Sequence, residues 1–268
     1  MAGSRRSPLV EIVTQERRGS ALVLTINRPQ AGNSMSAEVS QAFLDILDGV
    51  EGDTTLRAVI VTGAGDRFFC TGGDVKRYAL IETKDQLRDM MRLASTVFKR
   101  FEALPVPVIA AINGYAIGGG VELLLGADIR VAAAHAEIGL PQIRLGIITA
   151  WGGYERLVRD IGYSRAMEIV MMGERVSAAE AKRLGLINAV AEDGDAVGAA
   201  LEMAAKFDKA APMALAGAKR VLLGAATLPP EEAEELAIET VVELWFTDDH
   251  REAEKAFAEK RDPVFKGK

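Results

Sequence analysis

Two short apolar strands that each run into a glycine-rich loop constrain the fold of this chain more than any other feature. Residues 58–62 (Ala-Val-Ile-Val-Thr) and 106–112 (Val-Pro-Val-Ile-Ala-Ala-Ile) have the continuous apolar character of buried strands. The loops that follow them span residues 63–74 and 114–120. Helical patterns lie between the strands, so we expect an α/β core in which strands and helices interleave.

Capping residues mark where several helices begin. Ser36 precedes a run with one apolar face, and Thr83 and Gln86 have the spacing of a capping box. Ser177 and Thr247 are placed to cap two later helices. The side chains predicted to face inward are Val39, Phe43, Ile46, Leu47 and Val50 in the first helix, and Leu87, Met90, Ala94, Val97 and Phe101 in the second.

The pattern changes along the chain. Strands are also predicted at residues 22–26, pairing with 10–14, and at 129–132. From about Trp151 onward the pattern is almost entirely helical, with a long helix expected from Pro230 to Phe246. These late helices carry more apolar surface than one chain is expected to bury, which indicates contacts between copies.

Composition narrows the classes of protein. The chain has 268 residues, a net charge of −6 and a single cysteine, Cys70. The length fits one large α/β domain, or one domain with a small appendage. No intrachain disulfide is possible, and a reducing compartment such as the cytoplasm fits best. Acidic charge disfavours nucleic acid as a partner. The first residues lack the apolar segment of a secretory signal, and the apolar stretch at 106–125 is interrupted by Asn113 and Glu122, so no membrane span is expected.

Several catalytic motifs are absent from the sequence. Residues 63–68 (Gly-Ala-Gly-Asp-Arg-Phe) begin like a dinucleotide-binding loop but have Phe68 in place of the third glycine. There is no phosphate-binding Gly-x-x-x-x-Gly-Lys motif and no Gly-x-Ser-x-Gly motif of serine hydrolases. With only His135, His250 and Cys70, we expect no metal site. Chemistry must therefore rest on carboxylates, amides, hydroxyls or backbone N–H groups.

The glycine loops offer such N–H groups. Glycine lets the backbone approach a ligand closely, and Gly118, Gly119 and Gly120 run directly into a predicted helix, whose N-terminus favours anions. Two N–H groups from the two loops could converge on one oxygen. The same glycines would also suit tight turns without a ligand, and Glu122 would suit the helix dipole alone.

The two loops together resemble the signature of the enoyl-CoA hydratase/isomerase (crotonase) superfamily. The matching segments are residues 66–76 (Asp-Arg-Phe-Phe-Cys-Thr-Gly-Gly-Asp-Val-Lys) and 113–122 (Asn-Gly-Tyr-Ala-Ile-Gly-Gly-Gly-Val-Glu). Residues 26–33, 140–146, 152–157 and 248–266 resemble flanking segments of the same family. Residues 173–188 resemble the family segment that places a helix before a short strand. The resemblance runs from about residue 10 to the end of the chain.

The resemblance implies a crotonase-like α/β fold, a spiral of ββα turns followed by a helical trimerisation region. We divide the chain accordingly into an acyl-CoA-binding core, 1–205, and a helical oligomerisation region, 206–268. Trimers, or hexamers built from two trimers, are the implied assemblies. The thioester oxygen would be held by the backbone N–H groups of Gly73 and Gly119, and Gly73 stands where many relatives carry alanine. This role requires the two N–H groups to point together, with room for a thioester.

Coenzyme A is implied as part of the substrate, and no separate cofactor is expected. Phe257 and Lys260 match C-terminal positions that reach the CoA of a neighbouring subunit. The residues implied for substrate and CoA binding are Gln30, Gly32, Gly73, Asp74, Val75, Lys76, Gly119, Phe257 and Lys260.

One position departs from the family hydratases. Glu122 matches the first of their two catalytic glutamates, but Gln142 stands where the second is expected. An amide cannot donate a proton to the α-carbon as a carboxylic acid can. The acid that dienoyl isomerases carry near Ala150 or Trp151 is also missing. Trp151 would either line the acyl pocket or pack beneath a helix.

Three functions remain open at this point. The first is an enoyl-CoA hydratase-like lyase in which Glu122 is the single acid/base and Gln142 orients water or substrate. The second keeps the enolate chemistry but uses it for decarboxylation or thioester hydrolysis of a special acyl-CoA. The third is a non-catalytic acyl-CoA-binding protein.

Overall fold

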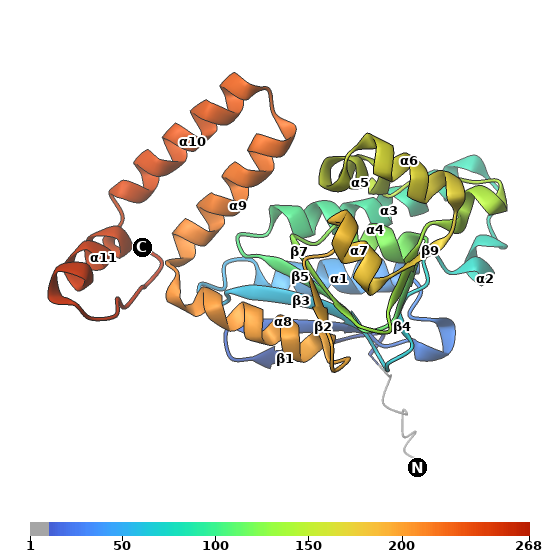
Figure 1. The fold of residues 1–268 in the computed structure, drawn as a ribbon, viewed down its shortest axis with the longest axis horizontal. Coiled ribbons are helices and arrows are strands. Elements are labelled where there is room, and N and C mark those ends of the chain that lie inside the picture. The colour runs from blue at the N-terminus through green and yellow to red at the C-terminus, as the bar shows by residue number, and fades with distance from the viewer. Residues whose placement is uncertain (1–10) are drawn as a thin grey trace, which may run out of the picture.

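Two sheets form the centre of the computed structural model, which describes residues 11–268 (Figure 1). The larger sheet has the order β1-β2-β3-β5-β7-β10 and the smaller has the order β4-β6-β8-β9. The strands of the larger sheet are β1 (Val13–Arg18), β2 (Ala21–Ile26), β3 (Ala58–Gly63), β5 (Val108–Ile112), β7 (Ile129–Ala133) and β10 (Ala189–Ala191). Those of the smaller sheet are β4 (Phe68–Cys70), β6 (Tyr115–Ile117), β8 (Glu137–Gly139) and β9 (Arg175–Ser177).

The chain builds these sheets as a spiral. Each turn places one strand in the larger sheet, the next strand in the smaller sheet, and then enters helical structure. The turns are β3–β4 with α2 (Val75–Tyr78) and α3 (Lys84–Ala103), β5–β6 with α4 (Gly119–Leu125), and β7–β8 with α5 (Gly153–Ile161). Successive turns pair in parallel within both sheets. This architecture confirms the ββα spiral that the resemblance implied.

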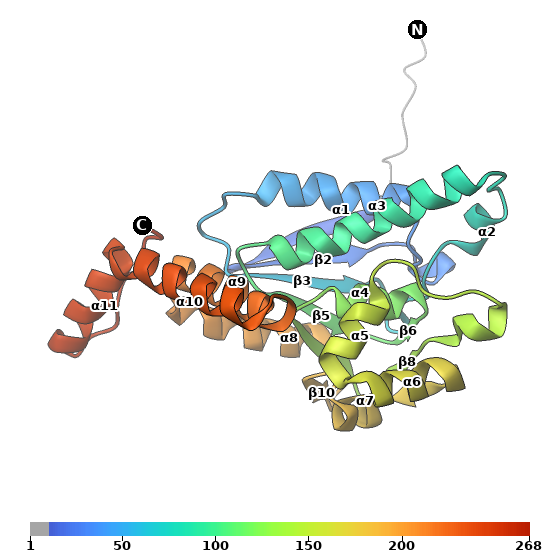
Figure 2. The same ribbon diagram turned by 90° about the horizontal axis from the view of Figure 1, so that it is seen from above.

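Helices cover both faces of the larger sheet (Figure 2). Leu24 and Val59 face the side covered by α1 (Ala37–Val50) and α3, whereas Val23 and Ile60 face α8 (Ala196–Ala205). Burial on both faces explains why the central strands β2, β3 and β5 are apolar at nearly every position. The remaining helices are α6 (Tyr163–Met172), α7 (Ala178–Leu184), α9 (Pro212–Thr227), α10 (Pro230–Trp245) and α11 (Asp248–Glu259), with 3-10 turns at Pro29–Ala31, Pro141–Leu145 and Lys206–Lys209.

The predicted helix caps are confirmed. The hydroxyl of Ser36 accepts a hydrogen bond from the N–H of Val39, and Thr83 and Gln86 form a complete capping box. Ser177 and Thr247 accept corresponding bonds at the starts of α7 and α11. These local signals fix helix starts because they satisfy N–H groups that have no partner inside the helix.

Four predictions about the fold need correction. The predicted loops 63–74 and 114–120 contain the short strands β4 and β6, and the region predicted as almost entirely helical also contains β9. Leu87, predicted to face inward, is 43% exposed because α3 extends beyond the sheet at its N-terminal end. The strand predicted at 10–14 is instead β1, which pairs Val13 with Ile26, and Val10 lies outside the described residues.

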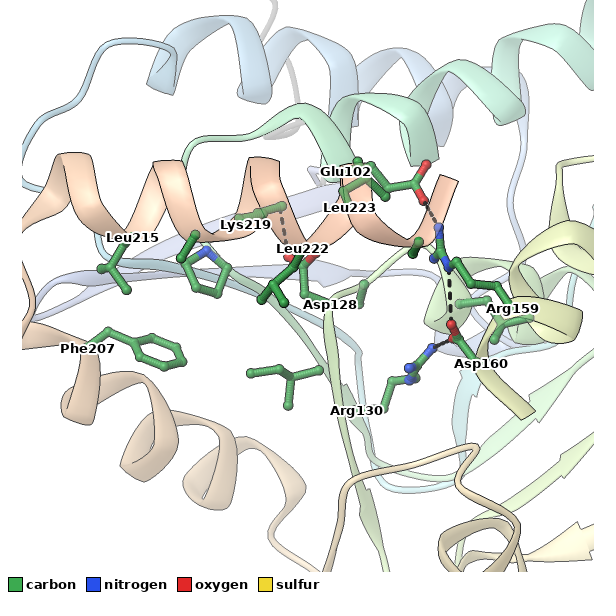
Figure 3. A pocket seen from close by; sticks show the side chains of 16 residues that line it. Glu102, Asp128, Arg130, Arg159, Asp160, Phe207, Leu215, Lys219, Leu222 and Leu223 are labelled. Carbon is green, nitrogen blue, oxygen red and sulfur yellow. Dashed lines mark hydrogen bonds and ion pairs between the residues drawn. The ribbon is translucent and has the colours of Figure 1, made fainter. Parts of the chain in front are cut away.

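The C-terminal helices extend to one side of the sheets (Figures 1 and 2). One anchor is Lys219 of α9, whose ammonium donates to the carbonyls of Phe101 and Val106 and pairs with Asp128 at 2.7 Å (Figure 3). Burial lowers the pKa of Lys219, and the charge of Asp128 opposes this shift. In the part of the chain that the structure describes, no helix combines the length and apolarity needed to cross a membrane. The functional boundary at 205/206 stays a prediction.

Candidate active site

The loop after β4 positions Gly73. The N–H of Met35 donates to the carbonyl of Gly72 at 2.8 Å, and the N–H of Asp74 donates to the carbonyl of Met35 at 2.9 Å. These two bonds make Met35 and Gly73 a parallel bridge pair. In such a pair Gly73 lies between the two residues that bond to Met35, and its own N–H is directed to the other side of its strand. The N–H of Gly73 therefore points away from Met35.

The second loop positions Gly119. It is the first residue of α4, so its N–H has no acceptor within the helix. Gly118 before it has φ of 60°, a left-handed conformation that glycine adopts without strain. A Cβ on Gly72 would lie 2.9 Å from the nitrogen of Gly119, so the two loops are in direct contact. This contact brings the two predicted oxyanion-hole residues to one place.

Glu122 lies one turn into α4 and is 2% exposed. Its carboxylate oxygen Oε1 accepts hydrogen bonds from the backbone N–H groups of Trp151, at 2.7 Å, and Gly153, at 3.1 Å. Burial raises the pKa of Glu122 to about 7, and these N–H donors oppose but do not cancel the shift. A carboxyl group with this pKa exchanges a proton readily at neutral pH.

A rigid turn carries the two donors to Glu122. The guanidinium of Arg156 donates to the carbonyls of Trp151 and Gly152, at 3.2 and 3.0 Å, and also forms an ion pair with Glu102 of α3. Gly152 has φ of 86°, and a Cβ there would lie 2.5 Å from the Arg156 side chain. The pattern at 152–157 pointed to this segment, but not to its backbone N–H groups as partners of Glu122.

Gln142 lies in the 3-10 turn Pro141–Leu145, against the start of α4. Its Nε2 would be 3.0 Å from a Cβ on Gly118, the residue that precedes the helix. Its side-chain oxygen is buried and has no hydrogen-bond partner among residues 11–268. A buried acceptor without a partner is costly, and a donor on a bound molecule would satisfy it. No three His, Cys, Asp or Glu side chains of these residues are grouped to hold a metal ion.

The predicted CoA residues of the core lie near the first loop. Gly32 ends the turn Pro29–Ala31 and accepts hydrogen bonds from the N–H and hydroxyl of Thr71, at 3.0 and 3.1 Å. Asp74 pairs with Arg28 at 2.7 Å and caps α2, so its carboxylate has a structural partner, and Arg28 holds the pKa of Asp74 below its usual value. Side chains free to meet a ligand are those of Gln30, Val75 and Lys76, which are exposed.

The predicted C-terminal CoA residues lie elsewhere. Phe257 and Lys260 belong to α11 and its C-terminal end, at the opposite end of the molecule from α2 (Figures 1 and 2). Phe257 is 88% exposed. One chain therefore does not bring these residues to its own site, and their contact with the CoA of a neighbouring subunit stays a prediction.

Two aromatic rings border the site. A Cβ on Gly73 would lie 2.0 Å from the hydroxyl of Tyr78, and one on Gly119 would lie 2.1 Å from the ring of Trp151. An N–H group and a Cβ leave the backbone in different directions, so these contacts do not place either ring in front of an N–H group. Trp151 both lines this space and packs on Phe98, with ring centroids 5.9 Å apart. No sequence pattern pointed to Tyr78 as a residue of the site.

A separate hollow of about 400 Å³ lies between α9 and the core (Figure 3). An ion-pair network of Arg130, Asp160, Arg159 and Glu102 borders it on one side. None of the predicted site residues lines this hollow. Its charged groups are already paired with one another, so it is distinct from the candidate active site.

Comparison with known proteins places the chain in one family. Residues 16–268 match the family model described as enoyl-CoA hydratase/isomerase. YngF of Bacillus subtilis, which carries an enoyl-CoA hydratase/isomerase name, is 40% identical over 91% of this chain and 94% of its own length. A carnitinyl-CoA dehydratase of Salmonella paratyphi A is 38% identical over 94% of this chain and 97% of its own.

Solved structures agree with the sequence comparisons. The crystal structure of an enoyl-CoA hydratase from Bacillus anthracis matches with a TM-score of 0.92 and 35% identity, covering 96% of this chain and all of that one. The matched region includes both glycine loops and Glu122. The chain belongs to the enoyl-CoA hydratase/isomerase (crotonase) family.

Proposed function

We propose that this chain is an enoyl-CoA hydratase-like lyase in which Glu122 is the only acid/base. The Glu122 carboxylate takes a proton from water, whose oxygen adds to the β-carbon of an enoyl-CoA. The electron pair of the double bond moves toward the thioester oxygen, which the N–H groups of Gly73 and Gly119 stabilise. Protonated Glu122 then returns the proton to the α-carbon. The product is a 3-hydroxyacyl-CoA, and Glu122 ends as it began.

One observation carries this proposal: Glu122 is buried at the loop contact with a pKa of about 7. A group with this pKa can accept a proton in one half of the reaction and donate it in the other without a large free-energy difference. Its Oε1 is held by two backbone N–H groups, which leaves Oε2 as the oxygen able to exchange the proton. Gln142 would orient water or the new hydroxyl through its unpaired side-chain oxygen.

The direct test is hydration of crotonyl-CoA by the purified protein. We expect loss of the enoyl absorbance and, in heavy water, incorporation of deuterium at the α-carbon. Mass spectrometry of the product distinguishes addition of water to the double bond from exchange of the α-proton for deuterium. A folded protein that neither hydrates crotonyl-CoA nor exchanges the α-proton would overturn the proposal.

The substitution Gln142→Glu tests the single-acid mechanism. A second carboxylate beside the start of α4 should add a second ionisation to the pH profile of kcat/KM, while the optimal rate changes by less than about tenfold. Kinetics from pH 5 to 9 on both proteins provide the measurement. Robust hydration by Gln142→Glu alongside an inactive native protein would show that the native reaction is a different one.

That different reaction would be decarboxylation or thioester hydrolysis of a special acyl-CoA. The observation that favours it is Gln142, since neither reaction needs a second acid in the hydratase role. Incubation with malonyl-type and branched acyl-CoAs, followed by mass spectrometry, would reveal free CoA or a shortened acyl-CoA. A non-catalytic binder would instead retain acyl-CoA affinity after Glu122→Gln with no turnover to lose.

Self-association is part of the proposal. Large apolar side chains are exposed along α9, α10 and the turn after α10, including Leu222, Val241, Trp245 and Phe246. Surfaces of this kind are typical of contacts between subunits. We propose a trimer or hexamer, which light scattering of the purified protein will distinguish. A reducing, cytoplasmic location fits the single buried thiol of Cys70.

A further inference from the structure

The aromatic rings of Tyr78 and Trp151 line the space beside both oxyanion-hole glycines. The Tyr78 hydroxyl occupies the position that a side chain on Gly73 would need, at 2.0 Å from an ideal Cβ. The Trp151 ring does the same at Gly119, where three of its carbons lie 2.1 to 2.9 Å from an ideal Cβ. Both rings therefore lie against the two loops that carry the N–H groups, where they can border a bound acyl group.

Trp151 is held firmly in this position. It is 4% exposed, its ring packs on Phe98 of α3, and its backbone N–H is bonded to Glu122. Its carbonyl accepts a hydrogen bond from Arg156. Moving the ring out of the way would disturb the same turn that holds the catalytic carboxylate. Trp151 is thus a fixed wall rather than a mobile side chain.

Tyr78 closes the other side. It ends the short helix α2 and packs against the hydrophobic core. Burial, together with the charge of Glu122, raises the pKa of Tyr78 to about 12, so its hydroxyl keeps its proton at neutral pH. Only glycine at position 73 leaves room for the ring in this place.

Very little space remains behind the two rings. Tyr78 and Trp151 share a cavity of about 10 Å³, which is bounded on its other sides by α1, the turn before it, and α3. A cavity of this size holds about one water molecule. The other residues that line it are Met35, Ser36, Ala37, Ser40, Met90 and Ala94.

A larger hollow lies beyond this wall. It measures about 470 Å³ and is lined by Ala150, the neighbour of Trp151, and by α3 residues that include Leu87 and Met91. The small cavity uses Met90 and Ala94 of α3 and the hollow uses Met91 and Ser95, so the two spaces share α3 and the Ala150–Trp151 segment.

We infer that Tyr78 and Trp151 limit the length of the acyl group, and that the chain acts on short acyl-CoAs such as crotonyl-CoA and excludes long ones. This inference rests on the proposed function for the reaction, but the length limit itself follows from the two rings and the small cavity. Both residues are determinants of specificity, and neither takes part in proton transfer.

The experiment compares kcat/KM for crotonyl-CoA and trans-2-decenoyl-CoA in the native protein and in Trp151→Leu. We expect kcat/KM of the native protein to be at least about tenfold higher for crotonyl-CoA. Each methylene of the acyl chain that does not fit in the pocket lowers kcat/KM by roughly tenfold or more. Trp151→Leu should raise the decenoyl-to-crotonyl ratio by about tenfold or more. Tyr78→Ala should raise the ratio as well, whereas Tyr78→Phe, which keeps the ring, should leave it unchanged.

Trp245→Leu is the matched control for loss of a tryptophan outside the site, and light scattering first checks that its subunit assembly is the native one. The decenoyl-to-crotonyl ratio of kcat/KM in this variant should equal that of the native protein. Equal use of both substrates by the native protein, or an unchanged ratio in folded Trp151→Leu, would overturn the inference.

Binding of saturated butyryl-CoA and decanoyl-CoA, measured by calorimetry, separates this inference from the proposed function. Native protein that hydrates nothing yet binds butyryl-CoA at least about tenfold more tightly would refute the proposed function and support the length limit. Equal binding of the two ligands would refute the length limit, whatever the protein hydrates.

Discussion

Replacing Glu122 by glutamine should lower kcat for crotonyl-CoA hydration by about 10³-fold or more, while the fold is retained. The glutamine side chain has the same shape, and its oxygen can still accept the N–H groups of Trp151 and Gly153. It cannot take a proton from water or return one to the α-carbon, and general acid–base catalysis contributes about 10²–10⁴-fold. Steady-state kinetics, with CoA binding as a check on the folded site, provide the measurement. Retention of more than a tenth of the native rate would contradict the role of Glu122.

The same substitution should stabilise the protein above neutral pH. The pKa of Glu122 rises from its ordinary value of 4.5 to about 7 in the folded chain. Below pH 4.5 the carboxyl group is protonated in both states, so its burial is not penalised. Between pH 4.5 and 7 the unfolded chain loses the proton and the folded chain keeps it, so the free energy of unfolding falls by about 3 kcal/mol and then levels off.

Glutamine carries no charge and avoids this loss. Glu122→Gln should therefore exceed the native protein in thermal stability at pH 8, and the difference should shrink toward pH 5. Thermal melts at the two pH values measure it. If the two proteins differ in thermal stability by the same amount at pH 5 and at pH 8, the Glu122 carboxyl group is not titrated between these pH values. A stabilising substitution that destroys activity is expected where a catalytic group is buried at a free-energy cost.

Gly120→Ala should lower the free energy of unfolding by at least about 3 kcal/mol, because its Cβ meets the rigid backbone. The Cβ would lie 1.9 Å from the carbonyl oxygen of Cys70 and 2.7 Å from its carbon. Relief of this clash requires the start of α4 to move away from the first glycine loop, which separates Gly73 from Gly119. We therefore expect both a lower Tm, by about 5 °C or more, and loss of hydration.

Gly49→Ala is the control for this prediction. Gly49 is an exposed helical residue near the end of α1, and a Cβ there would have no neighbour within 4 Å. Alanine should stabilise the helix by about 0.5–1 kcal/mol. Chemical denaturation of the two variants measures both effects. Equal stability of Gly120→Ala and the native protein would refute the close contact between the loops.

Much of the fold could be predicted because its signals are local. Ser36 and Thr83 cap their helices through side chains that act within one turn, and buried strands such as β5 are apolar at every position. The three-residue strands β4 and β6 could not be predicted, since their pairing is set by neighbours distant in the sequence. The exposure of Leu87 was missed because a helical apolar face does not reveal where the sheet beneath it ends.

The candidate site likewise has features that could be predicted from the sequence and features that could not. Gly73, Gly119 and Glu122 were found through their motif, and the structure brings the two glycine loops into contact and buries the carboxylate. The raised pKa of Glu122 could not be predicted, because it depends on how much of the carboxyl group is buried and on N–H donors about thirty positions away. Tyr78 also escaped prediction, since only the folded loop places its ring on Gly73.

The pH dependence of kcat/KM for crotonyl-CoA hydration is the sharpest test of Glu122 as the single acid/base, because it counts the ionising groups that the reaction needs. Glu122 must be ionised in the free enzyme to take a proton from water, and its pKa is about 7. We predict that kcat/KM rises with pH through a single ionisation near 7 and then stays level. A bell-shaped profile between pH 5 and 9, or a profile with no ionisation near 7, would contradict the account.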